Sequence, residues 1–192
     1  MNNLWLFRHG ETEWSRTGQH TGRTDKELTA LGRHQGECLG RRLQQRRFRL
    51  VLTSPLRRAR ETGALAGYPD ALVDEDLAEW DYGDYEGLTT DQIRTDAPGW
   101  TVWSGPVPGG ETIEEVSARA DRVIRTALEE PGDVAAFAHA HLLRVLAARW
   151  LGLPPQAGRL LALHAASVSV VSREELQPFI SLWNDIGHLA GT

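Results

Sequence analysis

The sequence predicts an α/β protein of three layers, an α/β/α sandwich in which helices cover both faces of a mostly parallel central sheet. Short apolar runs that are typical of buried strands alternate with longer segments whose apolar residues recur every three or four positions. With 192 residues and a hydrophobic content of 41%, the chain is long enough for one well-filled core and short for two. We therefore expect residues 1–192 to form a single domain.

The first half of the chain is expected to contain five elements. These are strands at 4–7, 50–53 and 71–73 and helices at 29–47 and 55–66. The second helix has a favourable beginning, because Ser54 is a good N-cap residue and Pro55 suits the first helical position. The first helix carries the lone Cys38 among apolar positions, where we expect it to fill the core. Its arginine-rich end at 41–49 is interpreted as a solvated helix terminus, because cations suit that end of the helix dipole.

The second half is expected to begin, after a glycine- and tryptophan-rich stretch, with a helix at Glu111 or Thr112. Thr112 and Glu115 have the spacing of a capping box, and an apolar stripe of helical period follows them. Further strands are expected at 134–138, 168–171 and 179–182, with a helix at 141–151. Gly152 and Pro154 are expected to stop that last helix.

Charge and composition exclude several classes of protein. The formal net charge of −5 argues against nucleic acid or an anionic membrane as the main partner. The beginning of the sequence lacks the basic and long apolar regions of a signal peptide, and no later run is long enough to span a membrane. We expect a cytoplasmic protein whose partner is a small molecule, while assembly into a homo-oligomer stays open.

Two histidines follow apolar runs that are typical of strands. His9 comes directly after the first predicted strand, and His139 comes directly after the strand predicted at 134–138. If both strands belong to one open α/β sheet, both rings lie at strand carboxyl ends, where such sheets build their sites. The chain then has a nucleophile and a partner for it.

Three further side chains could take part in chemistry. Arg58 lies in the first turn of a predicted helix, where backbone N–H groups and a guanidinium together favour an anion, and Arg8 adds a second guanidinium beside His9. Glu79 stands in a loop rich in acidic and aromatic residues, and a carboxyl group held against apolar rings can act as a general acid near neutral pH. An ordinary solvated acidic loop is the alternative interpretation of that segment.

Five motifs, in this order, resemble those of the histidine phosphatase superfamily, which includes the cofactor-dependent phosphoglycerate mutases. They are Arg8-His9-Gly10-Glu11-Thr12, the segment from Ser54 to Thr62, Leu77-Ala78-Glu79 with the segment from Tyr82 to Gly87, Gly109-Gly110-Glu111-Thr112, and Phe137-Ala138-His139. The motifs extend over nearly the whole chain. The resemblance implies a phosphoglycerate mutase-like sandwich with a phosphate pocket at the strand carboxyl ends.

The resemblance also implies roles for individual residues. His9 is the nucleophile, Arg8, Arg58 and His139 form the phosphate pocket with it, and Glu79 is the proton donor. The implied substrate-binding set is Arg8, Ser15, Thr21, Gly22, Arg58, Tyr82 and Ala140. No metal or cofactor is implied. The expected function is hydrolysis of a small phosphate ester, such as a sugar phosphate, through a phosphohistidine on His9.

Two positions depart from the usual pattern of the superfamily. Ala140 follows His139 where a glycine is usual, and Ser15 follows Trp14 where an asparagine is often found. The methyl group of Ala140 could crowd a backbone N–H group directed at phosphate. Around these positions the sequence looks most like the branch of the superfamily that contains fungal sedoheptulose-1,7-bisphosphatase. Proteins of this branch are often described as acid phosphatases.

Two alternative functions stay open. A phosphoglycerate mutase needs a second anion site, but the segment 82–110 is short and Arg94 is its only basic residue, which disfavours that reaction. A metal-dependent hydrolase is suggested by His139 and His141, because residues two apart on a strand point to one face. No further ligand motif follows this pair.

Overall fold

The computed structural model describes residues 2–190, and its centre is a six-stranded sheet of order β3-β2-β4-β1-β5-β6. The first four strands in this order are parallel: β3 (Leu72–Val73), β2 (Leu50–Thr53), β4 (Val134–Ala138) and β1 (Asn2–Arg8). The last two, β5 (Val168–Glu174) and β6 (Gln177–Asp185), pair antiparallel. The predicted fold class, with a mostly parallel sheet, is confirmed.

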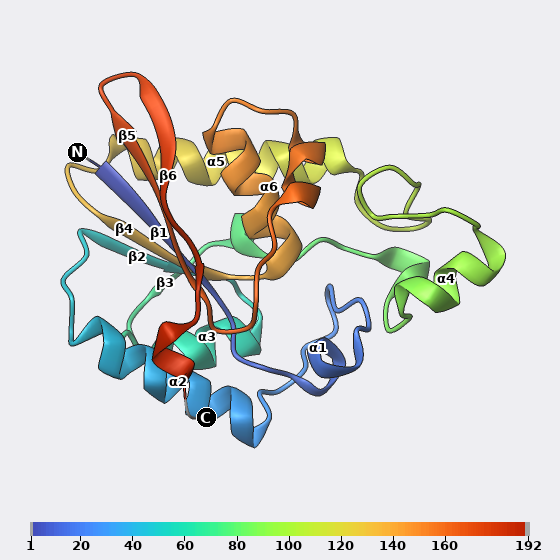
Figure 1. Ribbon diagram of the computed structural model, residues 1–192, viewed down its shortest axis with the longest axis horizontal. Helices are drawn as coiled ribbons and strands as arrows, with labels where there is room; N and C mark the ends of the chain where they lie inside the picture. Colours follow the sequence, from blue (N-terminus) through green and yellow to red (C-terminus); the bar gives the residue numbers. More distant parts are fainter. Residues whose placement is uncertain (1, 191–192) are drawn as a thin grey trace.

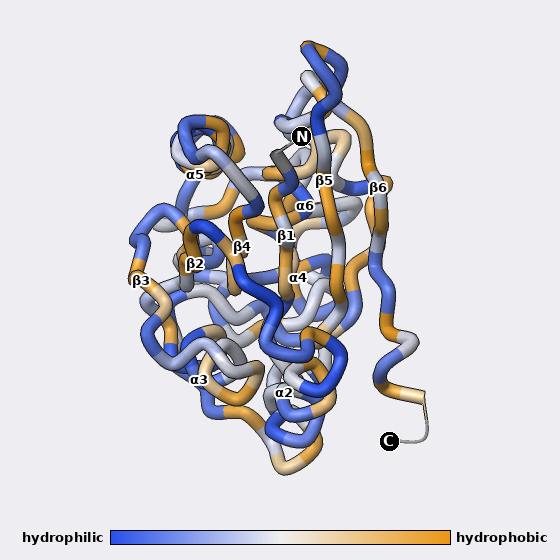
Figure 2. The backbone as a smooth tube through the Cα atoms, turned by 90° about the vertical axis from the view of Figure 1, so that its left-hand side faces the viewer, coloured by the Kyte–Doolittle hydropathy of each residue, from blue (hydrophilic) through white to orange (hydrophobic). Residues whose placement is uncertain are grey.

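Helices cover both faces of the sheet (Figure 1), with α2 (Ala30–Leu43) and α3 (Arg57–Leu65) on one face and α5 (Ile113–Glu129) and α6 (Ala140–Trp150) on the other. Alternate residues of the strands supply two separate cores. Phe7 and Phe137 pack with Leu39 of α2, whereas Leu6 packs with Val123 of α5. Figure 2 shows the apolar strands β1 and β4 between these helix layers.

The register of the two central strands brings the two predicted histidines together. Phe7 pairs with Phe137 and Arg8 pairs with Ala138, so His9 and His139 follow equivalent ends of neighbouring parallel strands. The His9 backbone N–H group donates to the Ala138 carbonyl at 3.0 Å, and its carbonyl accepts from Ala166 N–H at 3.0 Å. Sheet hydrogen bonding therefore fixes the backbone of His9 from both sides.

Two short helices were not predicted, and both lie beyond the carboxyl ends of the parallel strands in Figure 1. They are α1 (Glu13–Thr17) and α4 (Thr90–Asp96). Each begins with a capping box, formed by Thr12 with Ser15 and by Thr89 with Gln92. Short 3₁₀ helices lie at Glu75–Leu77, Gly83–Tyr85, Pro155–Leu160 and Gly187–Leu189.

Several predicted boundaries need correction. The helix predicted at 29–47 ends at Leu43, because Gln44 and Gln45 adopt left-handed backbone conformations with φ of 45° and 57°. Only the first part of the arginine-rich segment is therefore helical. The strands predicted at 168–171 and 179–182 are longer than expected because they form one antiparallel hairpin. The capping box of Thr112 and Glu115 is confirmed at the start of α5, and Cys38 is a buried free cysteine.

The start of α3 also differs from the prediction. The helix begins at Arg57, and its N-cap position is Leu56 rather than Ser54. Ser54 Oγ accepts from Leu56 N–H at 3.2 Å and lies 2.7 Å from His139 Nε2, so this hydroxyl serves a turn and a site histidine. Arg58 is nevertheless in the first helical turn, as predicted.

Within residues 2–190, no helix has both the length and the apolar character needed to cross a membrane.

Candidate active site

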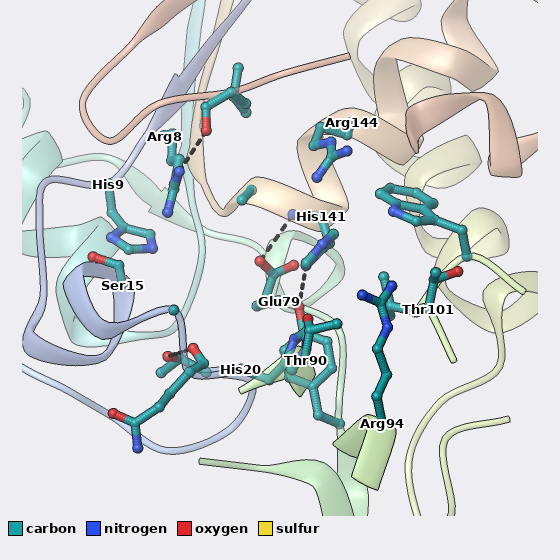
Figure 3. A pocket seen from close by; sticks show the side chains of 18 residues that line it. Arg8, His9, Ser15, His20, Glu79, Thr90, Arg94, Thr101, His141 and Arg144 are labelled. Carbon is teal, nitrogen blue, oxygen red and sulfur yellow. Dashed lines mark hydrogen bonds between the residues drawn. The ribbon is translucent and has the colours of Figure 1, made fainter. Parts of the chain in front are cut away.

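A cavity of about 420 Å³ opens at the carboxyl ends of β1 and β4 (Figure 3). Arg8, His9 and Ser15 lie on one side of it, and Arg94, Thr101 and Arg144 lie on the opposite side. Glu79 and His141 lie between the two sides. The complete lining is Arg8, His9, Ser15, Gly18, Gln19, His20, Thr21, Glu79, Tyr82, Thr90, Arg94, Thr101, Val102, Trp103, Ala140, His141, Arg144 and Leu163.

The His9 ring is held in one tautomer. Its Nδ1 lies 2.7 Å from the Gly10 carbonyl oxygen, which can only accept, so Nδ1 carries the proton and donates it. Burial, and then the guanidinium groups of Arg58 and Arg8, hold the pKa of His9 well below its usual 6.5. The ring is therefore neutral at pH 7, and the lone pair is on Nε2.

His139 is fully buried and has the opposite tautomer. Arg58 Nε donates to His139 Nδ1 at 3.1 Å, which leaves the ring proton on Nε2, 2.7 Å from Ser54 Oγ. Burial is the main reason that the pKa of His139 lies well below 6.5, followed by the charge of Arg58. The rings of His9 and His139 are 5.1 Å apart between centroids.

Arg58 is fully buried beside this histidine pair. Its terminal nitrogens donate to the carbonyl groups of Thr21, Gly22 and Thr24, each at 3.0 Å. Burial lowers the pKa of Arg58, and the Glu79 carboxylate opposes that shift. Arg58 and His139 are not among the residues that line the cavity, so their direct contact with phosphate stays a prediction.

Arg8 reaches the cavity from the end of β1. Its Nη1 donates to the Leu163 carbonyl at 2.5 Å, whereas its buried Nε has no hydrogen-bond partner among the described residues. A buried donor without an acceptor is costly, so the protein groups among the described residues leave this guanidinium group incompletely satisfied. Burial lowers the pKa of Arg8, opposed first by the charge of Glu79.

Glu79 lies at the amino-terminal end of α6. Its Oε1 accepts from Trp80 N–H at 3.0 Å and Leu142 N–H at 2.9 Å, and its Oε2 accepts from His141 N–H at 3.1 Å. The carboxyl group therefore satisfies two N–H groups of the first turn of α6 and faces the same cavity as His9. The loop that contains it is not an ordinary solvated acidic loop, because Glu79 is buried.

Of the other residues in the implied substrate-binding set, four line the cavity and one does not. Ser15, Thr21, Tyr82 and Ala140 belong to the lining. Gly22 lies outside it: its N–H group donates to both carboxylate oxygens of Glu86, and its carbonyl accepts from Arg58.

Several lining residues were not predicted as site residues. They are Gly18, Gln19, His20, Thr90, Arg94, Thr101, Val102, Arg144 and Leu163. Arg94 and Arg144 are 50 positions apart in the sequence and meet only because α4 and α6 approach the same cavity. His141 also lines the cavity, although the sequence suggests this residue only as a metal ligand.

The middle of the cavity is an uncharged aromatic cluster formed by His20, Tyr82 and His141. The Tyr82 hydroxyl oxygen lies 2.6 Å from His141 Nδ1, and the His20 ring is 4.7 Å from the Tyr82 ring. Burial lowers the pKa of His20 to about 4, and burial followed by Arg144 holds the pKa of His141 well below 6.5. Burial raises the pKa of Tyr82 well above 10. All three groups are therefore neutral at pH 7.

We expect the stability of the fold to decrease as the pH falls below about 6.5. His9, His20, His139 and His141 are neutral in the folded chain, whereas each takes up a proton in the unfolded chain near its usual pKa. The unfolded state then binds more protons, so the free energy of unfolding falls by up to about 1.4 kcal/mol per pH unit for each histidine. Urea unfolding at pH 8, 7, 6 and 5 measures this slope. His20→Gln should reduce this slope by up to the contribution of one histidine. An unchanged slope would contradict the assignment of His20 as neutral in the folded chain.

The two histidines of the metal-site hypothesis are both engaged with protein groups. His139 accepts from Arg58, whereas His141 lies in the first turn of α6 and contacts Tyr82. In the part of the chain that the structure describes, no group of three or more histidine, cysteine, aspartate or glutamate side chains is arranged to hold a metal ion.

Residues 4–186 match the model of the histidine phosphatase superfamily, branch 1. The chain is 44% identical to an acid phosphatase of Mycobacterium tuberculosis over 90% of this chain and 87% of that protein. It is 36% identical to sedoheptulose 1,7-bisphosphatase of Saccharomyces cerevisiae, over 79% of this chain and 68% of the relative. It is also 30% identical, over 98% and 95% of the two chains, to a Salmonella choleraesuis protein named "Probable phosphoglycerate mutase GpmB".

Among solved structures, a mycobacterial glucosyl-3-phosphoglycerate phosphatase in complex with VO3 superposes with a TM-score of 0.85. The two are 32% identical, with 96% of this chain and 99% of that chain covered. The chain belongs to branch 1 of the histidine phosphatase superfamily. It is thus an enzyme of the histidine phosphatase type, and the expected resemblance is confirmed.

Proposed function

We propose that the protein hydrolyses phosphate monoesters of small hydroxylated molecules through a phosphoryl group carried on His9, without a metal ion. The observation that carries this proposal is the His9 ring, which is neutral, fixed through Nδ1 and exposed to the same cavity as the carboxyl group of Glu79. A nucleophile and a proton donor facing one cavity are the two groups that a two-step ester hydrolysis needs.

In the first step, the lone pair of His9 Nε2 attacks phosphorus, and the bond between phosphorus and the ester oxygen breaks. Glu79, as the carboxylic acid, gives its proton to the departing alkoxide, which leaves as an alcohol. Arg8, whose guanidinium group carries a positive charge and which lines the cavity, stabilises the negative charge on the equatorial phosphoryl oxygens. Arg58 and the buried His139 contribute to the same phosphate pocket.

In the second step, water attacks the phosphorus atom of the phosphohistidine. The Glu79 carboxylate takes a proton from this water, and the bond between phosphorus and Nε2 breaks. Inorganic phosphate leaves, His9 is neutral again and Glu79 is protonated for the next cycle. Both steps use only groups of this chain and water.

The opposite wall of the cavity is suited to bind a leaving group that carries hydroxyl groups and a second negative charge. Arg94 and Arg144 line it, and neither forms a salt bridge with an acidic side chain among residues 2–190. Backbone carbonyls hold both guanidinium groups: Arg94 Nε donates to Trp100 at 2.9 Å, and Arg144 Nε donates to Gly158 at 3.0 Å. Arg144 also lies 4.6 Å from the ring of Trp103. These groups are pre-oriented donors for an anion.

A substrate screen in the presence of EDTA tests the proposal. The screen compares sugar phosphates, n-alkyl phosphates and the matching α,ω-alkanediol bisphosphates, with release of inorganic phosphate as the readout. We expect hydrolysis to continue under chelation and to be inhibited by vanadate, which resembles the five-coordinate phosphoryl group. Bisphosphates should have a KM about 10-fold lower than the matching monophosphates, because charge-assisted hydrogen bonds to the second phosphate add to binding.

Two results would overturn parts of the proposal, one from this screen and one from a separate assay with 3-phosphoglycerate. Loss of activity on chelation, with recovery on addition of zinc or manganese, would favour the metal-dependent alternative. Formation of 2-phosphoglycerate from 3-phosphoglycerate, dependent on a bisphosphoglycerate primer, would favour the mutase. The mutase is kept as the second candidate because Arg144 adds to Arg94 a positive charge that lies outside the segment 82–110.

A further inference from the structure

The loop that carries Glu79 is held from behind by one ion pair. Arg119 of α5 and Glu111, just before that helix, form a two-bonded pair in which Arg119 Nε and Nη2 donate to the two Glu111 carboxylate oxygens, each at 2.8 Å. The Arg119 side chain is 13% exposed and that of Glu111 is 19% exposed. Neither residue lines the cavity that contains His9.

The remaining donors of Arg119 are all directed at the backbone of the Glu79 loop. Nη1 donates to the Asp76 carbonyl at 2.8 Å and to the Ala78 carbonyl at 2.9 Å, and Nη2 approaches the carbonyl of Glu79 itself at 3.4 Å. A guanidinium group has five N–H donors in a fixed plane, and here all five are used. Three carbonyl groups of one short loop are therefore fixed relative to α5.

Glu111 holds the other end of the same loop. Its Oε2 accepts from Asp81 N–H at 2.9 Å, its backbone N–H donates to the Asp81 carbonyl at 3.0 Å, and its carbonyl accepts from Trp80 Nε1 at 2.8 Å. The pair thus binds the chain on both sides of Glu79. On its cavity side, the carboxyl group of Glu79 meets the first turn of α6.

We propose that Arg119 and Glu111 are positioning residues that hold the carboxyl group of Glu79 where it can protonate the leaving group. The inference rests on the proposed function, because it assigns a role in the proton transfer assigned to Glu79. Proton transfer depends on a hydrogen-bond distance between acid and leaving oxygen, so a small displacement of this loop weakens it. Binding of the phosphoryl group by Arg8 and attack by His9 do not use this loop.

Arg119→Met tests the proposal, because methionine keeps much of the side-chain length and removes all five donors. The measured quantity is the ratio of kcat/KM for an alkyl phosphate to kcat/KM for p-nitrophenyl phosphate, whose leaving group hardly needs a proton. We expect this ratio to fall about 10- to 100-fold, as for partial loss of general acid catalysis. The ratio for Arg119→Lys should lie between those of the wild-type enzyme and Arg119→Met, because an ammonium group can keep some of the carbonyl contacts.

Arg122→Met is the matched control. Arg122 is on the same helix and binds the same loop, but only through the carboxylate of Asp76, and its side chain is 49% exposed. Its loss should leave the substrate ratio unchanged, since exposed ion pairs contribute little. If Arg119 is only structural, its variants lower activity toward both substrates equally, with a lower unfolding midpoint, and the proposal is overturned.

A double-mutant cycle separates this inference from the proposed function. In a Glu79→Gln background, Arg119→Met should change the substrate ratio no further, because the group that it positions is already lost. If Glu79→Gln itself leaves the ratio unchanged, the proton-donor role of Glu79 fails. If Glu79→Gln lowers the ratio but Arg119→Met and Arg119→Lys do not, only the positioning role fails.

Discussion

Replacement of His9 by alanine is expected to abolish turnover of every phosphate ester that the wild-type enzyme hydrolyses. The loss should be on the order of 10⁴-fold or more, because the proposed covalent intermediate forms on His9. Wild-type enzyme quenched with denaturant during turnover should carry one acid-labile, base-stable phosphoryl group per chain. The His9→Ala variant should carry none, as measured by mass spectrometry of the quenched protein.

The control for this variant is His34→Ala. His34 is exposed on α2 and lies outside the cavity, so its loss should leave both turnover and labelling unchanged. Vanadate binding to His9→Ala, measured by calorimetry, shows whether the cavity survives the substitution. A folded His9→Ala enzyme with near-normal activity would rule out His9 as the nucleophile.

Replacement of Glu79 by glutamine is expected to slow the hydrolysis of alkyl phosphates by about 10²- to 10⁴-fold, the usual contribution of a general acid. The effect on p-nitrophenyl phosphate should be smaller in the first step, because nitrophenolate leaves without a proton. The second step also uses Glu79 as a base, so the phosphohistidine should accumulate with this substrate. A burst of nitrophenol followed by a slow steady rate is the expected time course.

The glutamine side chain also has a structural cost that can be measured separately. Glu79 accepts three backbone N–H groups, and the amide nitrogen of glutamine cannot accept any. One or more N–H groups of Trp80, His141 or Leu142 lose their acceptor, which should lower the free energy of unfolding by about 1–3 kcal/mol. Glu114→Gln, at an exposed position of α5, is the control. Equal losses for both substrates, without a burst, would contradict the role of Glu79.

The central part of the fold could be predicted because its information is local. A buried strand such as 134–138 is a continuous apolar run, and a capping box such as Thr112 with Glu115 marks a helix start within four residues. Because parallel neighbours end at the same edge, the two histidines after β1 and β4 had to lie close together. The register of these strands then fixed the 5.1 Å separation of the rings.

The opposite wall of the cavity could not be predicted because it depends on long-range packing. Arg94 lies on a helix of only seven residues inside a glycine- and tryptophan-rich stretch, and Arg144 lies on the first half of α6 with no motif of its own beyond the family resemblance. His20 lacks any local signal and becomes part of the site through contacts with Tyr82 and His141. Trp103 belongs to the lining of the cavity, whereas Trp14, Trp80 and Trp100 do not.

The Ser54 N-cap prediction failed for a related reason. The sequence Ser-Pro is compatible with a helix start, but the hydroxyl group of Ser54 lies next to His139, 85 positions further along the chain. The contacts of a residue in a functional site depend on that site as well as on local helix preference. Because the Ser54 hydroxyl group contacts His139, it does not cap the helix, which begins at Arg57.

For the proposed intermediate, the hydrogen bond between His9 Nδ1 and the Gly10 carbonyl determines which isomer of phosphohistidine we expect. Only Nε2 has a free lone pair, so we expect the phosphoryl group to attach there and to give the τ isomer rather than the π isomer. The two isomers differ in chemical lifetime and in their recognition by isomer-specific antibodies. A carbonyl group one residue away thus sets the regiochemistry expected of the proposed covalent intermediate.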